Sequence, residues 1–141
     1  MATQTIENYR EAAEVYQGDA PCREKFTQLL EEHGLPKGLF PLEDIKEFGY
    51  NRAAGFMWLV QKKKNEHTFK KIKQTVSFAT EVTAFVEQRK MKKITGAKGK
   101  QLLLWLSLVE IYIDDPSSEK ITFKSGTGLS DSFPVSVFEL E

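Results

Sequence analysis

The most apolar stretch of the chain is Gln101–Asp115 (QLLLWLSLVEIYIDD). It opens with an unbroken apolar segment, Leu102 to Leu106, and then alternates apolar and polar positions through Val109, Ile111 and Ile113. Alternation at period two predicts a half-buried strand, and a continuous apolar opening predicts a strand covered on both sides. Because roughly 15 residues in a strand would span about 50 Å, we expect a bend or bulge near Ser107. This segment is predicted to be the central strand of a β-rich core.

The N-terminal part follows a helical period instead. Residues 3–17 place apolar side chains at helical spacing and predict an amphipathic helix that ends near Gly18. A second helix is expected to be capped by Asp19, to carry the apolar stripe Cys22, Phe26, Leu29 and Leu30, and to stop at Gly34. We expect these helices to form a hairpin over residues 1–34 that packs on the rest.

Residues 35–141 contain short alternating segments typical of strands. Strands are expected near 48–50, 56–61, 75–94, 101–115, 121–123 and 133–137, with turns at 62–67 and 114–118 and hairpin loops at 96–101 and 125–130. Residues 81–94 also fit a helix face, but their Val and Thr content favours strand. The predicted fold is mostly β: a compact closed or curled antiparallel β-barrel of about seven strands with two N-terminal α-helices, in one domain over 1–141.

Length, cysteine content and the lack of long apolar runs indicate the cellular compartment of the protein. At 141 residues, the chain is long enough for one core without metal or disulfide support, and the single cysteine, Cys22, excludes an internal disulfide framework. Residues 1–17 lack the basic patch and apolar core of a signal peptide, and no apolar run reaches the roughly 18 residues of a membrane span. We therefore expect a cytoplasmic protein, with peripheral attachment to a membrane left open.

Charge is strongly segregated along the chain, although the net charge is zero. Residues 1–60 carry 6 Lys/Arg against 10 Asp/Glu (net −4), residues 61–100 carry 12 against 3 (net +9), and residues 101–141 carry 2 against 7 (net −5). Pairing of the basic segments as neighbouring strands would gather their lysines on one rim, where an anionic lipid head group could bind. The lysines of this predicted rim are Lys62, Lys63, Lys64, Lys70, Lys71, Lys90, Lys92 and Lys93. The alternative is a solvated basic face that keeps edge strands apart.

Candidate catalytic chemistry is sparse. His33 and His67 lack partners at metal-ligand spacing, no Gly-x-Ser-x-Gly elbow is present, and the glycine pairs at 96–99 and 126–128 fail as phosphate loops. No catalytic residue, metal site or cofactor is therefore predicted. Lysine outnumbers arginine and no aromatic RNA-binding motif is present, which disfavours specific nucleic-acid recognition. Phe56, Trp58 and Trp105 are expected in the core or lining an apolar ligand cavity.

Three stretches together resemble the plant family named domain of unknown function 538. These are LLEEHGLPKGLFP (29–41), VSFATEVTAFVEQRKMKKITGAKGKQLLLWLSLVEIYIDDP (76–116) and ITFKSGTGLSDSFPVSVFE (121–139). The resemblance implies a compact β-barrel with N-terminal helices, a remote similarity to bactericidal/permeability-increasing lipid-binding modules, and an association with stress responses and trichome development. It also implies two activities: binding of lipid or lipopolysaccharide, and hydrolysis of chlorophyll-like esters.

We expect a non-catalytic module that binds an amphipathic anionic ligand, most simply a phospholipid or a membrane surface, in plant stress or developmental signalling. The alternatives are an esterase acting on lipophilic esters and a protein-interaction domain. Neither the oligomeric state nor a protein partner follows from the sequence.

Overall fold

A single antiparallel sheet organises the molecule. The computed structural model describes residues 2–101 and 103–139, and within them nine strands pair in the order β1-β2-β3-β5-β6-β7-β8-β9, with β4 beside β5. The strands are β1 Glu14–Gln17, β2 Ile45–Asn51, β3 Phe56–Gln61, β4 Asn65–Phe69, β5 Gln74–Glu87, β6 Lys90–Gln101, β7 Leu104–Tyr112, β8 Lys120–Ser125 and β9 Ser130–Pro134. The helices are α1 Ala2–Arg10 and α2 Asp19–Glu32, with 3-10 turns at Pro116–Ser118 and Val135–Phe138.

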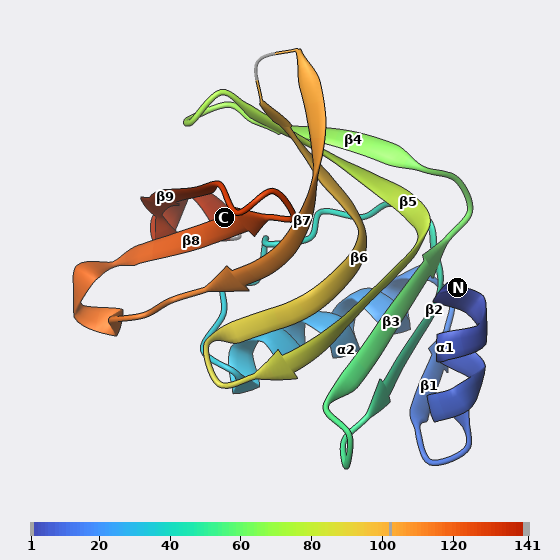
Figure 1. Cartoon of the computed structure of the whole chain (residues 1–141). Coiled ribbons are helices and arrows are strands. Elements are labelled where there is room, and N and C mark those ends of the chain that lie inside the picture. Colours follow the sequence, from blue (N-terminus) through green and yellow to red (C-terminus); the bar gives the residue numbers. More distant parts are fainter. Residues whose placement is uncertain (1, 102, 140–141) are drawn as a thin grey trace.

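The sheet curls strongly but does not close (Figure 1). Strands β1 and β9 are the two ends of the pairing order. The predicted mostly β, antiparallel architecture with two helices is confirmed. Of the predicted closed or curled barrel of about seven strands, the curled form is confirmed. Closure and the strand count are wrong, because the sheet stays open and has nine strands in the described chain.

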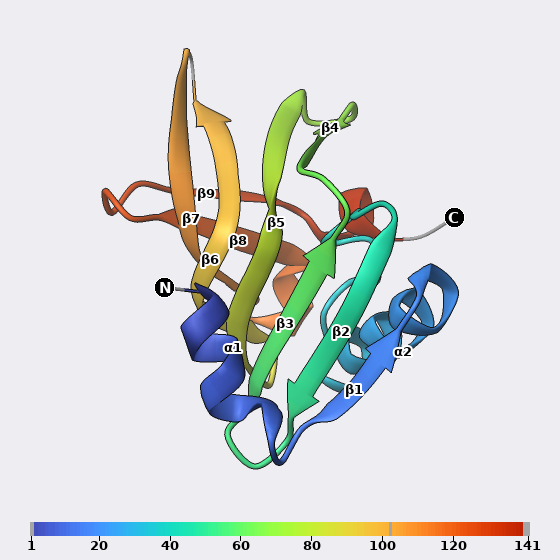
Figure 2. The same cartoon turned by 90° about the vertical axis from the view of Figure 1, so that its right-hand side faces the viewer.

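The two helices cover opposite faces of the sheet (Figure 2). Helix α2 buries its predicted stripe, Cys22 to Leu30, in the main core on the concave face. Helix α1 instead packs Ile6 against Phe56 and Trp58 on the other face of β3. The expected helical hairpin over residues 1–34 is therefore wrong, because β1 lies between the helices and pairs with β2.

The helix predicted over residues 3–17 ends at Arg10, because the residues that follow pair with β2. Val15 lies opposite Gly49 and Tyr16 opposite Phe48, so residues Glu14–Gln17 complete the edge of the sheet. The helical spacing of the apolar side chains favoured the helix, but the strand hydrogen bonds available at β2 outweigh it. The left-handed stop at Gly34, where φ is 69°, is confirmed. The predicted cap at Asp19 is wrong, because Gly18 is the N-cap and Asp19 is the first helical residue, where its carboxylate accepts a hydrogen bond from the Ile45 N–H.

Strands β5, β6 and β7 are the longest part of the sheet and project beyond it. The strand preference at residues 81–94 is confirmed, since β5 ends at Glu87 and β6 begins at Lys90. The loop predicted at 96–101 is wrong, because these residues belong to β6 and pair with β5 and β7 on either side. The hairpin turn lies instead after Gln101, which pairs with Leu104.

The C-terminal segment closes over the concave side. Only Phe133 of the predicted 133–137 strand lies well inside β9, and Val135–Phe138 form a 3-10 turn that buries Phe138. Pro134 has no N–H to extend the strand pairing, which accounts for the end of β9. This turn brings Phe138 against Phe69 and Phe123, at ring-centroid distances of 4.7 and 5.1 Å.

Candidate functional site

The tip of the β6–β7 hairpin exposes apolar side chains to solvent. Leu103 is 90% exposed, Leu104 66% and Trp105 38%. We call these three residues the apolar tip. The prediction that the unbroken apolar opening of the 101–115 segment is covered on both sides is wrong, and Leu102 lies outside the described residues. The remainder of that segment behaves as predicted, with Leu108 and Ile111 buried and a register shift between Leu108 and Glu110, close to the bend expected near Ser107.

The apolar tip faces outward in more than one direction. Leu104 and Trp105 are consecutive in β7, so their side chains project from opposite faces of the hairpin. Trp105 lies opposite Lys100, whose ammonium nitrogen is 5.7 Å from the indole centroid. The hairpin forms the uppermost projection of the molecule in Figure 1. A flat partner could cover only one side of such a tip.

Lysines surround the base of the apolar tip. The turn between β4 and β5 lies at the same end of the sheet, because Val76 of β5 pairs with Gly99 of β6. This turn carries exposed lysines, and Lys98 and Lys100 of β6 add to them. We call the set the lysine rim: Lys70, Lys71, Lys73, Lys98 and Lys100. Within the described chain no carboxylate lies within ion-pair distance of any of the five.

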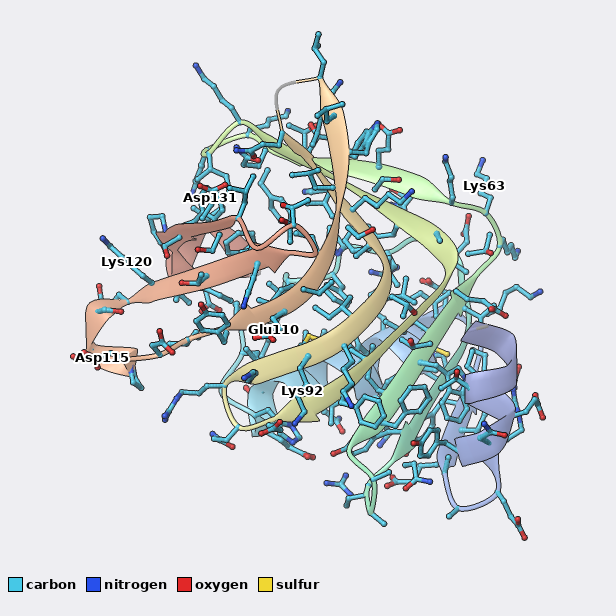
Figure 3. The ribbon with its side chains drawn as sticks, viewed as in Figure 1. Lys63, Lys92, Glu110, Asp115, Lys120 and Asp131 are labelled. Carbon is cyan, nitrogen blue, oxygen red and sulfur yellow. The ribbon has the colours of Figure 1, made fainter. Side chains whose placement is uncertain are left out.

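The predicted head-group lysines do not converge on one rim. Lys70 and Lys71 precede β5, whereas Lys90 and Lys92 lie opposite Glu87 and Phe85 near its other end. About ten residues of strand, roughly 30 Å, separate the two sets. Lys62, Lys63 and Lys64 occupy a third place between β3 and β4, and Figure 3 shows Lys63 and Lys92 at widely separated positions.

The lysines at the far end are neutralised by neighbouring carboxylates. Lys92 pairs with Glu87, and Lys90 lies 3.7 Å from Glu110 of β7. Hydrogen bonding to Lys92 holds the pKa of the Glu87 carboxyl below its ordinary value. Lys93 lies over the ring of Phe85, with its nitrogen 5.6 Å from the centroid. Lys90 and Lys92 therefore have carboxylate partners, whereas the lysine rim has none among the described residues.

An apolar groove opens directly beside the apolar tip. Its walls come from β5, β6 and β7 on one side and from β8, β9 and the final 3-10 turn on the other. Val76, Leu108 and Phe138 are buried at its base, while Leu106 and Phe133 are half-buried along its sides. Leu129 stands at its edge and is 58% exposed. The enclosed space measures about 60 Å³.

Two of the three aromatic residues predicted to lie in the core or to line a ligand cavity are core residues. Phe56 and Trp58 are buried beneath α1, at 1% and 0% exposure, and Trp58 donates a hydrogen bond to Glu47 at 2.8 Å. They belong to the core on the face opposite the groove, whereas Trp105 lies at the apolar tip. One sequence signal could have identified the tip. The polar residues Lys100 and Gln101 directly precede the apolar run, as they would at a hairpin turn.

The histidines have structural neighbours. Nδ1 of His33 lies 2.9 Å from the carbonyl oxygen of Leu29, as the predicted position at a helix C-terminus suggested, and His67 packs on Phe69. Among the described residues, no cluster of His, Cys, Asp or Glu could hold a metal ion. The esterase and protein-interaction hypotheses stay predictions.

One comparison with known proteins gives a match. The model of the family described as "Protein of unknown function, DUF538" matches residues 26–139, which is most of the chain. No curated protein and no solved structure matches. The similarity to bactericidal/permeability-increasing modules therefore stays a prediction. In the described part of the chain, neither helix is long and apolar enough to cross a membrane.

Proposed function

We propose that this chain, which belongs to the DUF538 family of proteins of unknown function, is a non-catalytic module that binds anionic phospholipid membranes through its apolar tip and lysine rim. The observation that carries the proposal is the exposure of Leu103 and Leu104 at the end of a projecting hairpin, next to lysines that have no carboxylate partner among residues 2–101 and 103–139.

The apolar tip suits a bilayer better than water. Full burial of a leucine side chain is worth about 1.5–3 kcal/mol, so two inserted leucines supply several kcal/mol. Tryptophan favours the interface between hydrocarbon and water because its ring is apolar and its N–H is polar. Insertion of Leu103 and Leu104 would therefore place Trp105 and Lys100 at head-group depth, since they lie one step further from the tip.

The lysine rim adds electrostatic attraction to anionic lipid, which complements the apolar insertion of the tip. Each lysine near an anionic bilayer contributes on the order of 1 kcal/mol, and the contribution is screened by salt. The five lysines of the rim form no ion pair within the described part of the chain, whereas Lys90 and Lys92 are paired with carboxylates at the far end. This arrangement favours one orientation, with the β6–β7 hairpin pointing into the membrane.

Vesicle co-sedimentation tests the proposal. The wild-type protein is expected to bind vesicles of phosphatidylcholine with phosphatidylglycerol and to bind pure phosphatidylcholine weakly. Changing Leu103→Ser and Leu104→Ser together should weaken binding at least about tenfold, because both side chains lose their transfer energy. The matched control is Ala53→Ser with Ala54→Ser, which removes two exposed apolar side chains from the β2–β3 turn.

Trp105 offers a direct reading of insertion. Trp58 is fully buried, so a blue shift of emission on adding anionic vesicles should come from Trp105 and should vanish in Trp105→Phe. Equal and negligible binding to both kinds of vesicle would overturn the proposal. If the double leucine variant bound vesicles as well as the wild type, the apolar tip would have no part in membrane binding.

A further inference from the structure

The groove beside the apolar tip is too narrow for a bulky ligand. Its enclosed volume of about 60 Å³ is far below the roughly 300–1,000 Å³ typical of pockets that enclose drug-sized molecules. A macrocycle or a fused ring system therefore has no room inside it. A slender hydrocarbon chain needs little enclosed volume, because it can lie along the open walls and bury only part of its length.

Apolar walls line the route from the tip into the groove. Leu104 and Leu106 lie on the same side of β7, since strand side chains alternate, and Leu106 and Leu108 continue that row into the groove. Phe123 of β8 and Phe133 of β9 pack edge to face on the opposite wall, with ring centroids 5.8 Å apart. A chain leaving a bilayer along Leu104 would thus stay in contact with apolar side chains.

Polar groups gather at the end of the groove that adjoins the tip. Val76 pairs with Gly99, so Gln74 and Gln101, two residues further along each strand, both lie at this end. Lys100 borders the groove at this end, and its ammonium group lies over Trp105 on the other face of the hairpin. Amide N–H groups can donate to ester oxygens and an ammonium group can bind a phosphate. At the β8–β9 side Asp131 lines the groove, and its carboxylate would repel a phosphate.

We infer that the groove takes one acyl chain of an anionic phospholipid, with the head group held at Gln74 and Gln101 and attracted by the nearby lysine rim. The inference rests on the proposed function and adds to it that the module binds an individual lipid molecule and not only a membrane surface. A lysophospholipid has only one acyl chain and is therefore the simplest ligand that fits the groove.

Titration calorimetry with monomeric lysophosphatidylglycerol, below its critical micelle concentration, tests this inference. The wild-type protein should bind it with one-to-one stoichiometry, and should bind lysophosphatidylcholine more weakly because the head group then has no net charge. The head group alone, glycerophosphoglycerol, should bind least because it places no chain in the groove.

Two groove variants and one matched control sharpen the test. Leu106→Glu and Leu129→Glu each bring a charge to the groove and should weaken binding by at least about tenfold. Ser107→Glu adds the same charge one residue from Leu106 on the opposite face of β7 and should change binding only slightly. Leu129 is well exposed, so its variant leaves the fold intact even if the Leu106 variant does not.

Parallel vesicle co-sedimentation separates this inference from the proposed function. Vesicle binding without saturable binding of the monomeric lipid would overturn the groove inference and leave membrane binding standing. The groove inference would also be overturned if Leu106→Glu, Leu129→Glu and Ser107→Glu all bound monomeric lysophosphatidylglycerol equally well. Monomer binding that is lost only in the groove variants would support it, and absence of vesicle binding by the wild type would overturn the proposed function.

Discussion

Glu47 holds the face of the sheet beneath α1 together. Its carboxylate accepts hydrogen bonds from Arg10 at 2.8 Å, from Trp58 at 2.8 Å and from Gln17 at 2.7 Å, and so joins α1, β1, β2 and β3. Burial tends to raise the pKa of Glu47, but these hydrogen bonds outweigh it and the pKa lies below its ordinary value. The ionised form therefore stabilises the folded chain.

The stability contribution of Glu47 should depend on pH. Because its pKa is lower in the folded than in the unfolded chain, the contribution is complete above the unfolded value of about 4.3 and is lost as pH falls through the folded value. Glu47→Gln should lower the free energy of unfolding by about 1–2 kcal/mol at pH 7 and by less near pH 3. Chemical denaturation at both pH values measures this.

Glu7→Gln provides the control for Glu47. Glu7 also pairs with Arg10, at 3.1 Å, but its side chain is 61% exposed, so its removal should cost under about 0.5 kcal/mol. A Glu47→Gln deficit of the same size at pH 3 and pH 7 would contradict the assigned role of the carboxylate.

Single residues also show where sequence reasoning fails. The run Leu102 to Leu106 was expected to be buried because hydrophobicity is the main signal for burial. Hydrophobicity predicts only that a side chain avoids water, and a membrane satisfies that preference as well as a core does. Cys22, Phe26, Leu29 and Leu30 were predicted correctly because their helical spacing defines a face, and a face needs a sheet to cover it.

At the level of elements, the β5–β6 pair depends on Gly96. This residue has φ of +84° and lies in the irregular part of the pair, where register shifts occur between Phe78 and Thr83. A side chain there would overlap the backbone carbonyl of Glu81. The glycine is therefore required by both its backbone conformation and the close approach of β5.

Gly96→Ala should destabilise the protein by more than about 2 kcal/mol, because a left-handed conformation and a backbone clash are combined. The matched control is Gly126→Ala in the β8–β9 loop, where an added Cβ would meet only Val109 at 3.7 Å. Thermal unfolding of both variants compares them. A Gly96→Ala protein as stable as Gly126→Ala would show that β5 and β6 can separate locally without cost.

The elements that sequence reasoning placed wrongly share one cause. Residues 96–101 contain two glycines and were expected to form a loop, but pairing from β5 and β7 on both sides keeps them in β6. Residues Glu14–Gln17 likewise follow β2 and not their helical spacing. Such long-range hydrogen bonds leave no local pattern, whereas the Val- and Thr-rich segment at 81–87 carries its strand preference within itself.

On the scale of the whole molecule, the basic segment 61–100 divides into two ends with different surroundings. One end carries the lysine rim beside the apolar tip, and the other carries Lys90 and Lys92 in ion pairs. The lysines of this segment were predicted to converge on one rim, and the strand register separates them into two ends instead. Sequence alone could not supply the register.

This division predicts that charge reversal at the two ends has different effects on membrane binding. Lys70→Glu with Lys71→Glu should weaken binding to anionic vesicles by at least about tenfold, since two contributions of about 1 kcal/mol are reversed in sign. Lys92→Glu with Lys93→Glu changes the net charge equally but acts roughly 30 Å away, beyond the screening length of about 10 Å at 0.1 M salt. Co-sedimentation over a series of salt concentrations should therefore show a reduced salt dependence for the first pair and an unchanged one for the second. Equal losses for both pairs would mean that net charge alone attracts the protein, without the orientation set by the hairpin.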